Sequence, residues 1–494
     1  MKNSKLYPLF CLVTGIIIIT VGILILNIGQ QMMNLLCYLG GIVVMLHAAL
    51  CAVSVIGKRK TLSKDSAKSL LISSCINIGI GVAVVFLPRF NLVPVYIIFT
   101  LYILINAVIK LVDYFIDRRD DVSGRLKELL LFVFFFVFAV LMIFVPEMGR
   151  RGFLTIAGIY CIIYGAFMLW DFVFRCLPER VQNRFKTKLS LPMPVLISTL
   201  RPFVNLKFRQ RVNTLDPERA RAEMKPFSPK GKETDDPPDM EVLIHISSKG
   251  YGITGHCDIA FEGKVYSYGS YDLESTSLFG TIGDGIFIVC PKEDYIRFYV
   301  TATPREIYGY GFRLTEEQKQ AVREEIANIK EMVYPWKTPL EELYEKDPTI
   351  KGEAAADWGS KKWNCTKADF YKFKSGKLKT YFVVTSNCVM LADKIVKKAC
   401  REININDPSG VLTPGEYYDY LEHLLAMVGS PVFCRTIYNK ETTSAWKYPP
   451  RIPYSSPELE MMTETEANRM AVKKNQGDNK SQKENKNVKN AKSK

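Results

Sequence analysis

Two residues far apart in the chain have the side chains and local settings that nucleophilic catalysis needs. Cys388 follows the apolar stretch 379–384 and precedes residues 389–400, whose apolar spacing predicts a helix. The positive end of a helix dipole favours a thiolate there, and the unpaired backbone N–H groups can hold an oxyanion. His256 starts a predicted strand that would hold its imidazole rigidly as a general base. The pair predicts acyl transfer through a thiol; a cysteine packed at a strand–helix junction is the structural alternative.

Ser386 and Asn387 immediately precede Cys388 and are expected to cap its helix and support the oxyanion site. The chain has 12 cysteines, and a cytoplasmic location would keep them as thiols. The sequence contains no CxxC pair and no Cys/His cluster with the spacing of metal ligands. Neither a metal nor a cofactor is therefore expected.

A third group is needed to orient the imidazole of His256, and the candidates are Tyr268, Ser267 and Asp272. A shift of one residue in the strand register reverses the face of every side chain, so the turn decides which candidate reaches His256. Tyr268 has the most favourable spacing, whereas Asp272 has the better chemistry for the role. His245, on the preceding predicted strand, is either a structural residue or a rival base.

The residues after 240 predict the strands and helices that would position this pair. A Glu262-Gly263 turn is predicted to join two strands, the second at 265–268. Thr315 and Gln318 form a capping-box pattern at the start of a helix. Further strands are predicted at 241–246, 285–290, 295–301 and 379–384. A charged segment with three tryptophans is predicted to be mobile: Trp336, Trp358 and Trp363.

Three short segments carry the predicted site: GHCDIAF with His256, the strand VYSYG, and SNCVMLADKI with Asn387 and Cys388. Their order resembles the permuted papain-like superfamily, which includes NlpC-type cell-wall amidases and the lecithin:retinol acyltransferase group. In those proteins a strand-borne histidine precedes a polar residue on the next strand, and the nucleophilic cysteine comes last, at the head of a helix. The resemblance, over about residues 240–430, implies an α+β hydrolase fold with Cys388 as nucleophile and His256 as base.

The first 176 residues have a different composition. Apolar runs there each approach the roughly 20 residues that a helix needs to cross a bilayer. They lie near 8–27, 33–56, 69–88, 92–114, 128–145 and 153–172. Helices that are apolar all round cannot all be buried in a soluble core of this size. The sequence therefore predicts an all-α, six-helix transmembrane bundle.

The apolar runs also form three similar hairpins. The second and third hairpins share a proline break, at Leu87-Pro88 and Val145-Pro146. The arrangement over residues 5–175 resembles the HdeD family of small bacterial six-helix membrane proteins. That resemblance supplies no catalytic residues.

Basic residues indicate the orientation in the membrane. The connections after the second and fourth runs are rich in Lys and Arg, whereas the others hold few, with Arg150 and Arg151 as the exception. By the positive-inside rule, the N-terminus and everything after the sixth run face the cytoplasm. The prediction is a multi-pass protein of the inner (plasma) membrane.

The remaining segments are polar. Residues 177–239 form a basic linker that is expected either to contact anionic lipid or to act only as a topology signal. The net charge of +15 does not indicate nucleic-acid binding, because the excess lies beside the membrane and in the Lys/Asn-rich tail, without stacking aromatics. The predicted domains are 1–176, 177–239, 240–450 (α+β, papain-like) and 451–494 (disordered).

The predicted function is that of a membrane-anchored thiol hydrolase, amidase-like or peptidase-like, acting on the cytoplasmic face. A lipid acyltransferase or acyl hydrolase of the same fold is the alternative, so the substrate is a peptide or an acyl lipid. A non-catalytic stress-response or assembly protein is a third possibility. A transporter is disfavoured because the predicted helices hold few charged residues apart from Lys110 and Asp113.

Overall fold

The computed structural model describes residues 6–57, 64–90, 93–176, 237–247, 255–303, 305–354, 357–400, 413–426, 430–439 and 450–455. The chain divides into two compact units, one of residues 1–118 and 123–191, the other of residues 119–122 and 192–494. Most of the predicted linker and most of the predicted tail lie outside the described residues.

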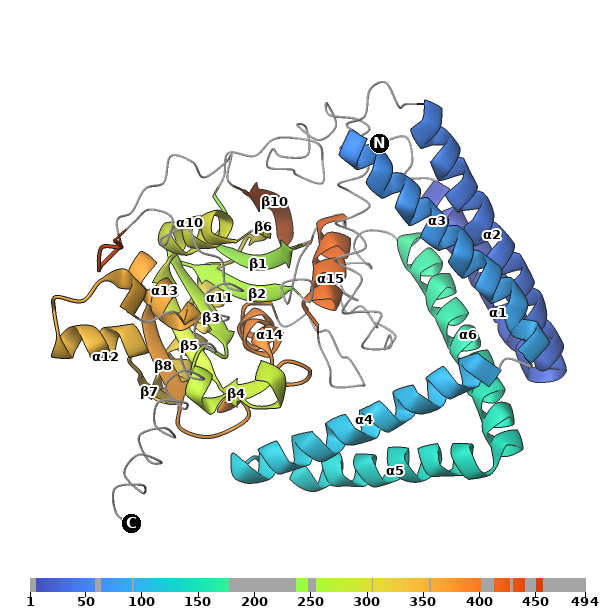
Figure 1. Ribbon diagram of the computed structural model, residues 1–494, viewed down its shortest axis with the longest axis horizontal. Coiled ribbons are helices and arrows are strands. Elements are labelled where there is room, and N and C mark those ends of the chain that lie inside the picture. The colour runs from blue at the N-terminus through green and yellow to red at the C-terminus, as the bar shows by residue number, and fades with distance from the viewer. Residues whose placement is uncertain are drawn as a thin grey trace, which may run out of the picture. The chain divides into compact units, whose positions relative to one another are not determined.

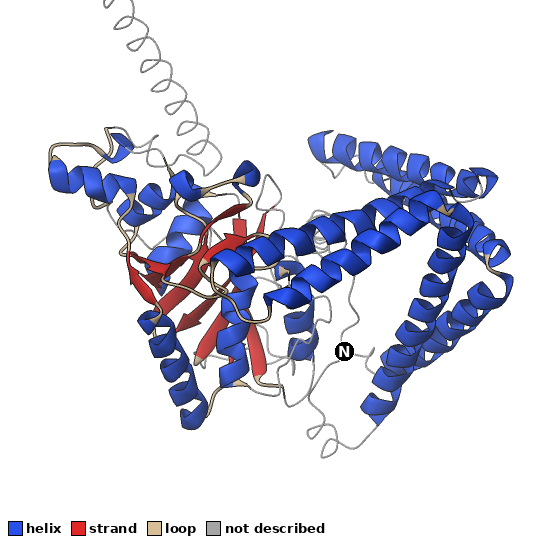
Figure 2. Ribbon diagram, turned by 90° about the horizontal axis from the view of Figure 1, so that it is seen from below, coloured by secondary structure: helices blue, strands red, loops and turns tan. Residues whose placement is uncertain are grey.

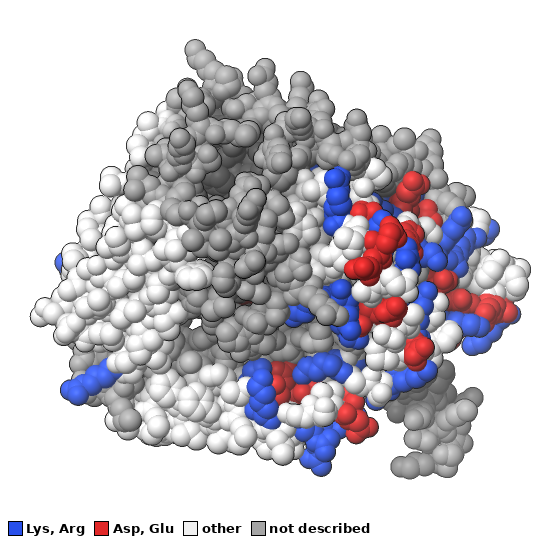
Figure 3. All heavy atoms as spheres, turned by 180° about the vertical axis from the view of Figure 1, so that it is seen from behind, with Lys and Arg blue, Asp and Glu red and all other residues white. Residues whose placement is uncertain are grey.

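The first unit consists of long apolar helices (Figure 1). They are α1 (Leu6–Ile28), α2 (Gln30–Gly57), α3 (Lys64–Phe86), α4 (Val93–Arg119), α5 (Arg125–Phe144) and α6 (Pro146–Cys176). Among the described residues, five helical stretches are long and apolar enough to cross a membrane, and α1 adds the shorter stretch Leu12–Ile28. Figure 3 shows this part of the surface almost without charged side chains. The prediction of several membrane-spanning helices is confirmed, with five of the six predicted spans meeting the criterion.

Glycines set the distance between α1 and α6. A Cβ atom added to Gly22 would lie 2.7 Å from the carbonyl oxygen of Gly158. Gly15 has the same relation to Gly165, with 3.0 Å between the added Cβ and that carbonyl oxygen. Any larger side chain at these positions would push the backbones apart, so the small residues allow the two helices to pack closely.

The predicted proline breaks fall at helix ends. Pro88 lies in the 3₁₀ turn η1 (Leu87–Phe90), and Pro146 is the first residue of α6. Proline is tolerated in the first turn of a helix because the N–H group that it lacks would have no partner there. Lys110 pairs with Asp113 within α4 at 3.4 Å and with Glu128 of α5 at 3.0 Å.

The second unit is built on an eight-stranded antiparallel sheet in the order β10-β6-β1-β2-β3-β5-β8-β7. Its strands are β1 (Met240–Ser247), β2 (His256–Phe261), β3 (Lys264–Gly269), β5 (Ile286–Pro291), β6 (Arg305–Phe312), β7 (Val333–Pro335), β8 (Asp369–Phe373) and β10 (Val432–Tyr438). A separate pair joins β4 (Ile282–Asp284) to β9 (Thr380–Phe382). The short 3₁₀ turns η3 (Leu273–Ser275) and η4 (Leu278–Gly280) precede β4, and η5 (Gly352–Ala354) lies further along the chain.

Helices cover both faces of this sheet (Figures 1 and 2). The first core lies between the sheet and α11 (Glu316–Glu331), α14 (Cys388–Ala399) and α15 (Pro414–Ala426). The second core lies between the opposite face and α10 (Lys292–Ala302), α12 (Pro339–Lys346) and α13 (Trp358–Cys365). This unit is an α/β region with an antiparallel sheet, which confirms the coarse fold prediction.

The β2–β3 hairpin forms as predicted. Its two turn residues, Glu262 and Gly263, have φ angles of 47° and 72°. Two consecutive positive φ angles characterise the type I′ turn, whose twist matches that of the flanking strands. The turn sets the register in which Phe261 lies opposite Lys264, and this register decides which face each side chain of the hairpin occupies.

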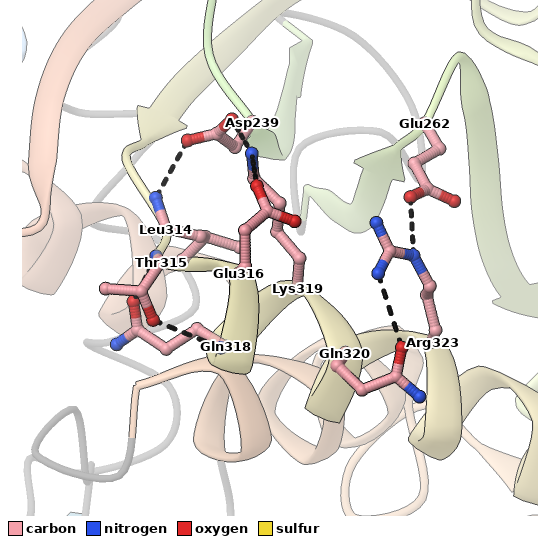
Figure 4. Close-up of polar contacts among 9 residues, drawn as sticks. All are labelled: Asp239, Glu262, Leu314, Thr315, Glu316, Gln318, Lys319, Gln320 and Arg323. Carbon is pink, nitrogen blue, oxygen red and sulfur yellow. Dashed lines mark hydrogen bonds and ion pairs between the residues drawn. The ribbon is translucent and has the colours of Figure 1, made fainter.

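The capping box of α11 is also confirmed (Figure 4). The Thr315 hydroxyl oxygen accepts a hydrogen bond from the Gln318 amide at 3.2 Å, and the Gln318 side chain accepts one from the Thr315 amide at 2.8 Å. Figure 4 also shows Asp239 accepting from the Leu314 amide, and Arg323 binding Glu262 at 2.7 Å. The last contact joins α11 to the tip of the β2–β3 hairpin.

Two predictions for this unit are wrong. The strand predicted at 295–301 is the helix α10, whose acidic residues Glu293 and Asp294 lie in the first turn, where the helix dipole favours them. Its aromatic and β-branched residues suggested a strand, but tertiary packing against the sheet decides the outcome. The tryptophan-containing segment predicted to be mobile holds α12 and α13, and both Trp358 and Trp363 are buried.

Candidate active site

Cys388 is the first residue of α14, as predicted, and it is buried. Asn387 caps the helix: its side-chain oxygen accepts from the Val389 amide at 3.0 Å, and its side-chain nitrogen donates to the Val383 carbonyl at 3.2 Å. The amide of Ser386 donates to the Phe382 carbonyl at 2.9 Å. These bonds fold the chain tightly after β9, and they hold Cys388 at the helix start.

His256 is the first residue of β2, and 12% of its side chain is exposed. Its Nε2 atom lies 3.0 Å from Oδ1 of Asp258 and 3.2 Å from Oγ of Ser267. The ladder pairs between β2 and β3 begin at Ile259, three residues further along β2. The imidazole therefore lies at the end of the sheet, where β2 extends beyond this ladder.

The protonated form of His256 is strongly favoured. Burial opposes the charge, but the negative charges of Asp258 and of Cys388, with hydrogen bonds to both, raise the pKa of His256 well above its ordinary value. The imidazole thus interacts with the carboxylate and with the sulfur at the start of α14. His256 and Cys388, which were paired from the sequence, thus lie near each other, and their catalytic roles stay a prediction.

Asp258 is the centre of a buried polar cluster. Its side chain has no exposed surface. Its Oδ2 atom lies 2.9 Å from Nε2 of His245 and accepts a hydrogen bond from the Tyr295 hydroxyl at 2.6 Å. Burial alone would raise the pKa of Asp258, but His256 and His245 hold it well below the ordinary range. A single carboxylate therefore lies between two imidazoles.

The three candidates for the orienting group have different positions. Ser267 contacts His256 directly. Tyr268 lies in the first core, where its hydroxyl donates to the Leu378 carbonyl at 2.8 Å. Asp272 caps η3 through the Glu274 amide and pairs with Lys372 at 2.7 Å. Tyr268 therefore binds the Leu378 carbonyl, and Asp272 binds the Glu274 amide and Lys372, in place of His256.

Tyr268 nevertheless lies close enough to Cys388 for the charge of the sulfur to affect the pKa of the tyrosine. Burial is the main reason that the pKa of Tyr268 is raised well above its ordinary value, and Tyr381, Asp120 and, least of the three, Cys388 raise it further. The same holds for Cys257, whose pKa is raised first by burial and next by Cys388. Cys388, Cys257 and Tyr268 all belong to the first core.

Asp258 was not among the residues predicted for the site, although the sequence contains a signal for it. Side chains two residues apart in a strand lie on the same face, so the order His256, Cys257, Asp258 places the carboxylate beside the imidazole. A neighbouring carboxylate is a common means of orienting a catalytic histidine. Among the described residues, no group of three or more His, Cys, Asp or Glu side chains is arranged to hold a metal ion.

Comparison with known proteins informs only the first unit. A family described as a short repeat of unknown function (DUF308), which contains HdeD-like membrane proteins, matches residues 72–144. No curated protein and no solved structure matches the chain. The matched residues extend from α3 to the end of α5. The chain is therefore a membrane-associated protein with a DUF308 repeat among its apolar helices. The matched residues do not extend into the α/β sheet that follows.

Proposed function

We propose that the second unit is a thiol hydrolase with a permuted papain-like arrangement, acting on an amide bond. The observation that carries this proposal is the interaction of His256 with both Cys388 and the buried carboxylate of Asp258. Cys388 is the nucleophile, His256 the general base and acid, and Asp258 the group that orients the imidazole.

The proposed reaction follows from this geometry. In the proposed resting pair His256 already carries the proton, and the Cys388 thiolate attacks the carbonyl carbon of the substrate to form a tetrahedral intermediate. His256 returns the proton to the leaving amine as the C–N bond breaks, which leaves a thioester on Cys388. Water, deprotonated by His256, then attacks the thioester and releases the acid, which leaves the Cys388 thiolate beside the protonated His256.

The oxyanion of the intermediate needs nearby donors. At the start of α14, the Val389 amide is bound by the Asn387 side chain, and the Met390 amide donates to the Asn387 carbonyl. Within the described part of the chain, this leaves the backbone amide of Cys388 as the candidate donor. Ser386, adjacent to Asn387 and buried, supports the loop that presents it.

The membrane-associated helices of the first unit would keep the reaction close to a bilayer, on the cytoplasmic face of the inner membrane in the orientation inferred from the basic loops. A peptide or isopeptide is the proposed substrate. An acyl lipid, transferred or hydrolysed by the same thioester chemistry, is the variant that membrane proximity favours. The basic segment 177–239 would then hold anionic lipid nearby.

Labelling of the full-length protein with thiol-reactive acyl probes tests this proposal. The Cys388→Ala variant should lose labelling by both an amide-derived and an ester-derived probe, and the preference of the wild type between them identifies the substrate class. Cys400→Ala is the matched control, because Cys400 is buried at the opposite end of α14. Undiminished labelling of Cys388→Ala would overturn the proposal.

The burial of Cys388, at 2% exposure, favours one competing function. A second unit that binds or assembles without catalysis would keep its sulfur enclosed. In that case neither probe would label wild-type Cys388, even though the His256 contact is intact.

A further inference from the structure

The second core encloses a positive charge. Lys362, on α13, is fully buried. Its Nζ atom donates to the Tyr271 hydroxyl at 2.8 Å and lies 4.3 Å, 4.7 Å and 5.0 Å from the ring centres of Tyr271, Tyr299 and Tyr295. Among the residues that the structure describes, no carboxylate lies within ion-pair distance of it. Aromatic faces attract a cation, but a buried lysine without a carboxylate partner is rare.

Tyr295 connects this ammonium group to the candidate active site. One face of its ring lies near Nζ of Lys362, and its hydroxyl donates to Oδ2 of Asp258 at 2.6 Å and lies 3.3 Å from Oγ of Ser267. Tyr299 makes a second connection, since its ring packs edge-to-face on His245 with 4.7 Å between centres. The ammonium group and the carboxylate are thus separated by a single aromatic side chain.

We infer that Lys362 is a positioning residue of the Cys388–His256 pair: across Tyr295, its enclosed charge acts on Asp258 and determines how strongly His256 holds its proton. The inference rests on the proposed function. The charge of Asp258 holds a proton on His256, and the charge of Lys362 opposes it. Charges interact strongly across a region that excludes water.

Other titratable side chains also lie in the region where the charge of Lys362 acts. They come from β1, β5, α10, α14 and the segment after β3, and they are His245, Cys290, Tyr295, Tyr299, Cys388 and Tyr271. The charge of Lys362 also affects Cys290. Burial is the main reason that the pKa of Cys290 is raised to about 12, whereas the charge of Lys362 lowers this pKa. The charge of Lys362 is therefore felt beyond its direct contacts.

The pH dependence of alkylation by iodoacetate tests the inference on the full-length protein in detergent. Carboxymethylation of Cys388 is followed by peptide mass spectrometry between pH 5 and 11. An imidazolium attracts the carboxylate of the reagent, so the rate should fall at the pH where His256 loses its proton. Loss of this descending limb in His256→Gln assigns it to that residue.

Removal of the lysine charge should move the descending limb. Lys362→Met is expected to shift it upward by roughly half to one pH unit, because one opposing positive charge is gone. Lys362→Arg keeps the charge and should restore the wild-type position. The matched control is Lys367→Met, which alters an exposed lysine just beyond α13. If the methionine variant does not fold, Lys362→Gln makes the same test while keeping a donor toward Tyr271.

The outcomes distinguish a failure of the proposed function from a failure of the inference on Lys362. If wild-type alkylation has no descending limb that His256→Gln removes, the proposed function fails whatever Lys362 does. If the limb is present but lies at the same pH in Lys362→Met and in the wild type, the inference on Lys362 is overturned and the proposed function stands.

Discussion

The two faces of the sheet in the second unit are packed with different chemistry. Between the sheet and α11, α14 and α15, the first core is built mainly from aliphatic and aromatic side chains, and Cys388 borders it. On the opposite face, the second core also encloses Asp258 and Lys362. His256 interacts with both sides, through Cys388 and through Asp258. Apolar packing around Cys388 comes from one face of the sheet, and the groups that act on the proton of His256 come from the other. We therefore expect that substitutions can change one without the other.

Replacement of Asp258 by Asn should have the largest effect on the polar side. The variant leaves two imidazoles around a neutral amide, so we expect labelling of Cys388 to fall by about 10³-fold and stability to fall by roughly 3 kcal/mol. Tryptophan fluorescence measures unfolding of this unit, since only Trp170 lies before residue 335. The control is Asp272→Asn, which breaks a partly exposed pair with Lys372. Equal losses of labelling and of stability in the two variants would contradict the role proposed for Asp258.

Leu391→Ala should disturb the first core alone. Leu391 is 1% exposed on α14, and removal of its side chain from a packed core is expected to lower the free energy of unfolding by about 3 kcal/mol. The pH at which iodoacetate alkylation of Cys388 falls should remain that of the wild type. A shift in that pH would show that the two faces are not separable.

The charge of His256 gives a pH dependence with a definite sign. Its pKa is raised in the folded state by Asp258 and Cys388 against the effect of burial, so its stabilisation is complete below the unfolded value of about 6.5 and is lost as pH rises through the raised pKa. The difference in unfolding free energy between wild type and His256→Gln should therefore shrink above about pH 6.5. Thermal unfolding from pH 6 to 10 measures it, and a difference that grows with pH would refute the sign.

Asp258 gives a pH dependence of stability with the opposite sign. Its pKa is lowered by His256 and His245 against the effect of burial, so its stabilisation is present above the unfolded value of about 3.9 and is lost as pH falls through the lowered pKa. Both contributions are complete only between about pH 4 and 6.5.

The smallest expected effect concerns the cap of α14. Asn387→Ala removes one helix cap and should lower the free energy of unfolding by about 1 kcal/mol. Thr315→Ala, at the capping box of α11, is the matched control for stability. Because only the first cap lies beside Cys388, labelling of that cysteine should slow in Asn387→Ala and remain normal in Thr315→Ala. Similar labelling of both variants would contradict this expectation.

Local patterns explain which parts of this molecule were predictable. The β2–β3 hairpin, the capping box of α11 and the helix after Asn387 depend on residues only a few positions apart, and their signals are strong. The apolar helices of the first unit follow from composition. The pairing of His256 with Cys388 came from a resemblance in motif order, which periodicity alone could not supply.

The rest depends on contacts between distant segments. In α10, Tyr295 and Tyr299 have side chains that favour strands, and only their packing against the sheet makes the segment helical. The role of Lys362 depends on tyrosines from two other segments, so no short stretch of sequence contains it. Asp258, in contrast, is indicated locally, because it lies two residues after His256 and therefore on the same face of the predicted strand.

The close packing of α1 on α6 has a consequence for biosynthesis. Among the described residues, these are the first and last long helices of the first unit, and ribosomes make proteins from the N-terminus onward. While α2 to α5 are being inserted, the glycine surface of α1 around Gly15 and Gly22 faces lipid or a temporary neighbour. The close packing of α1 on α6 can therefore form only after Gly158 and Gly165 have been synthesised.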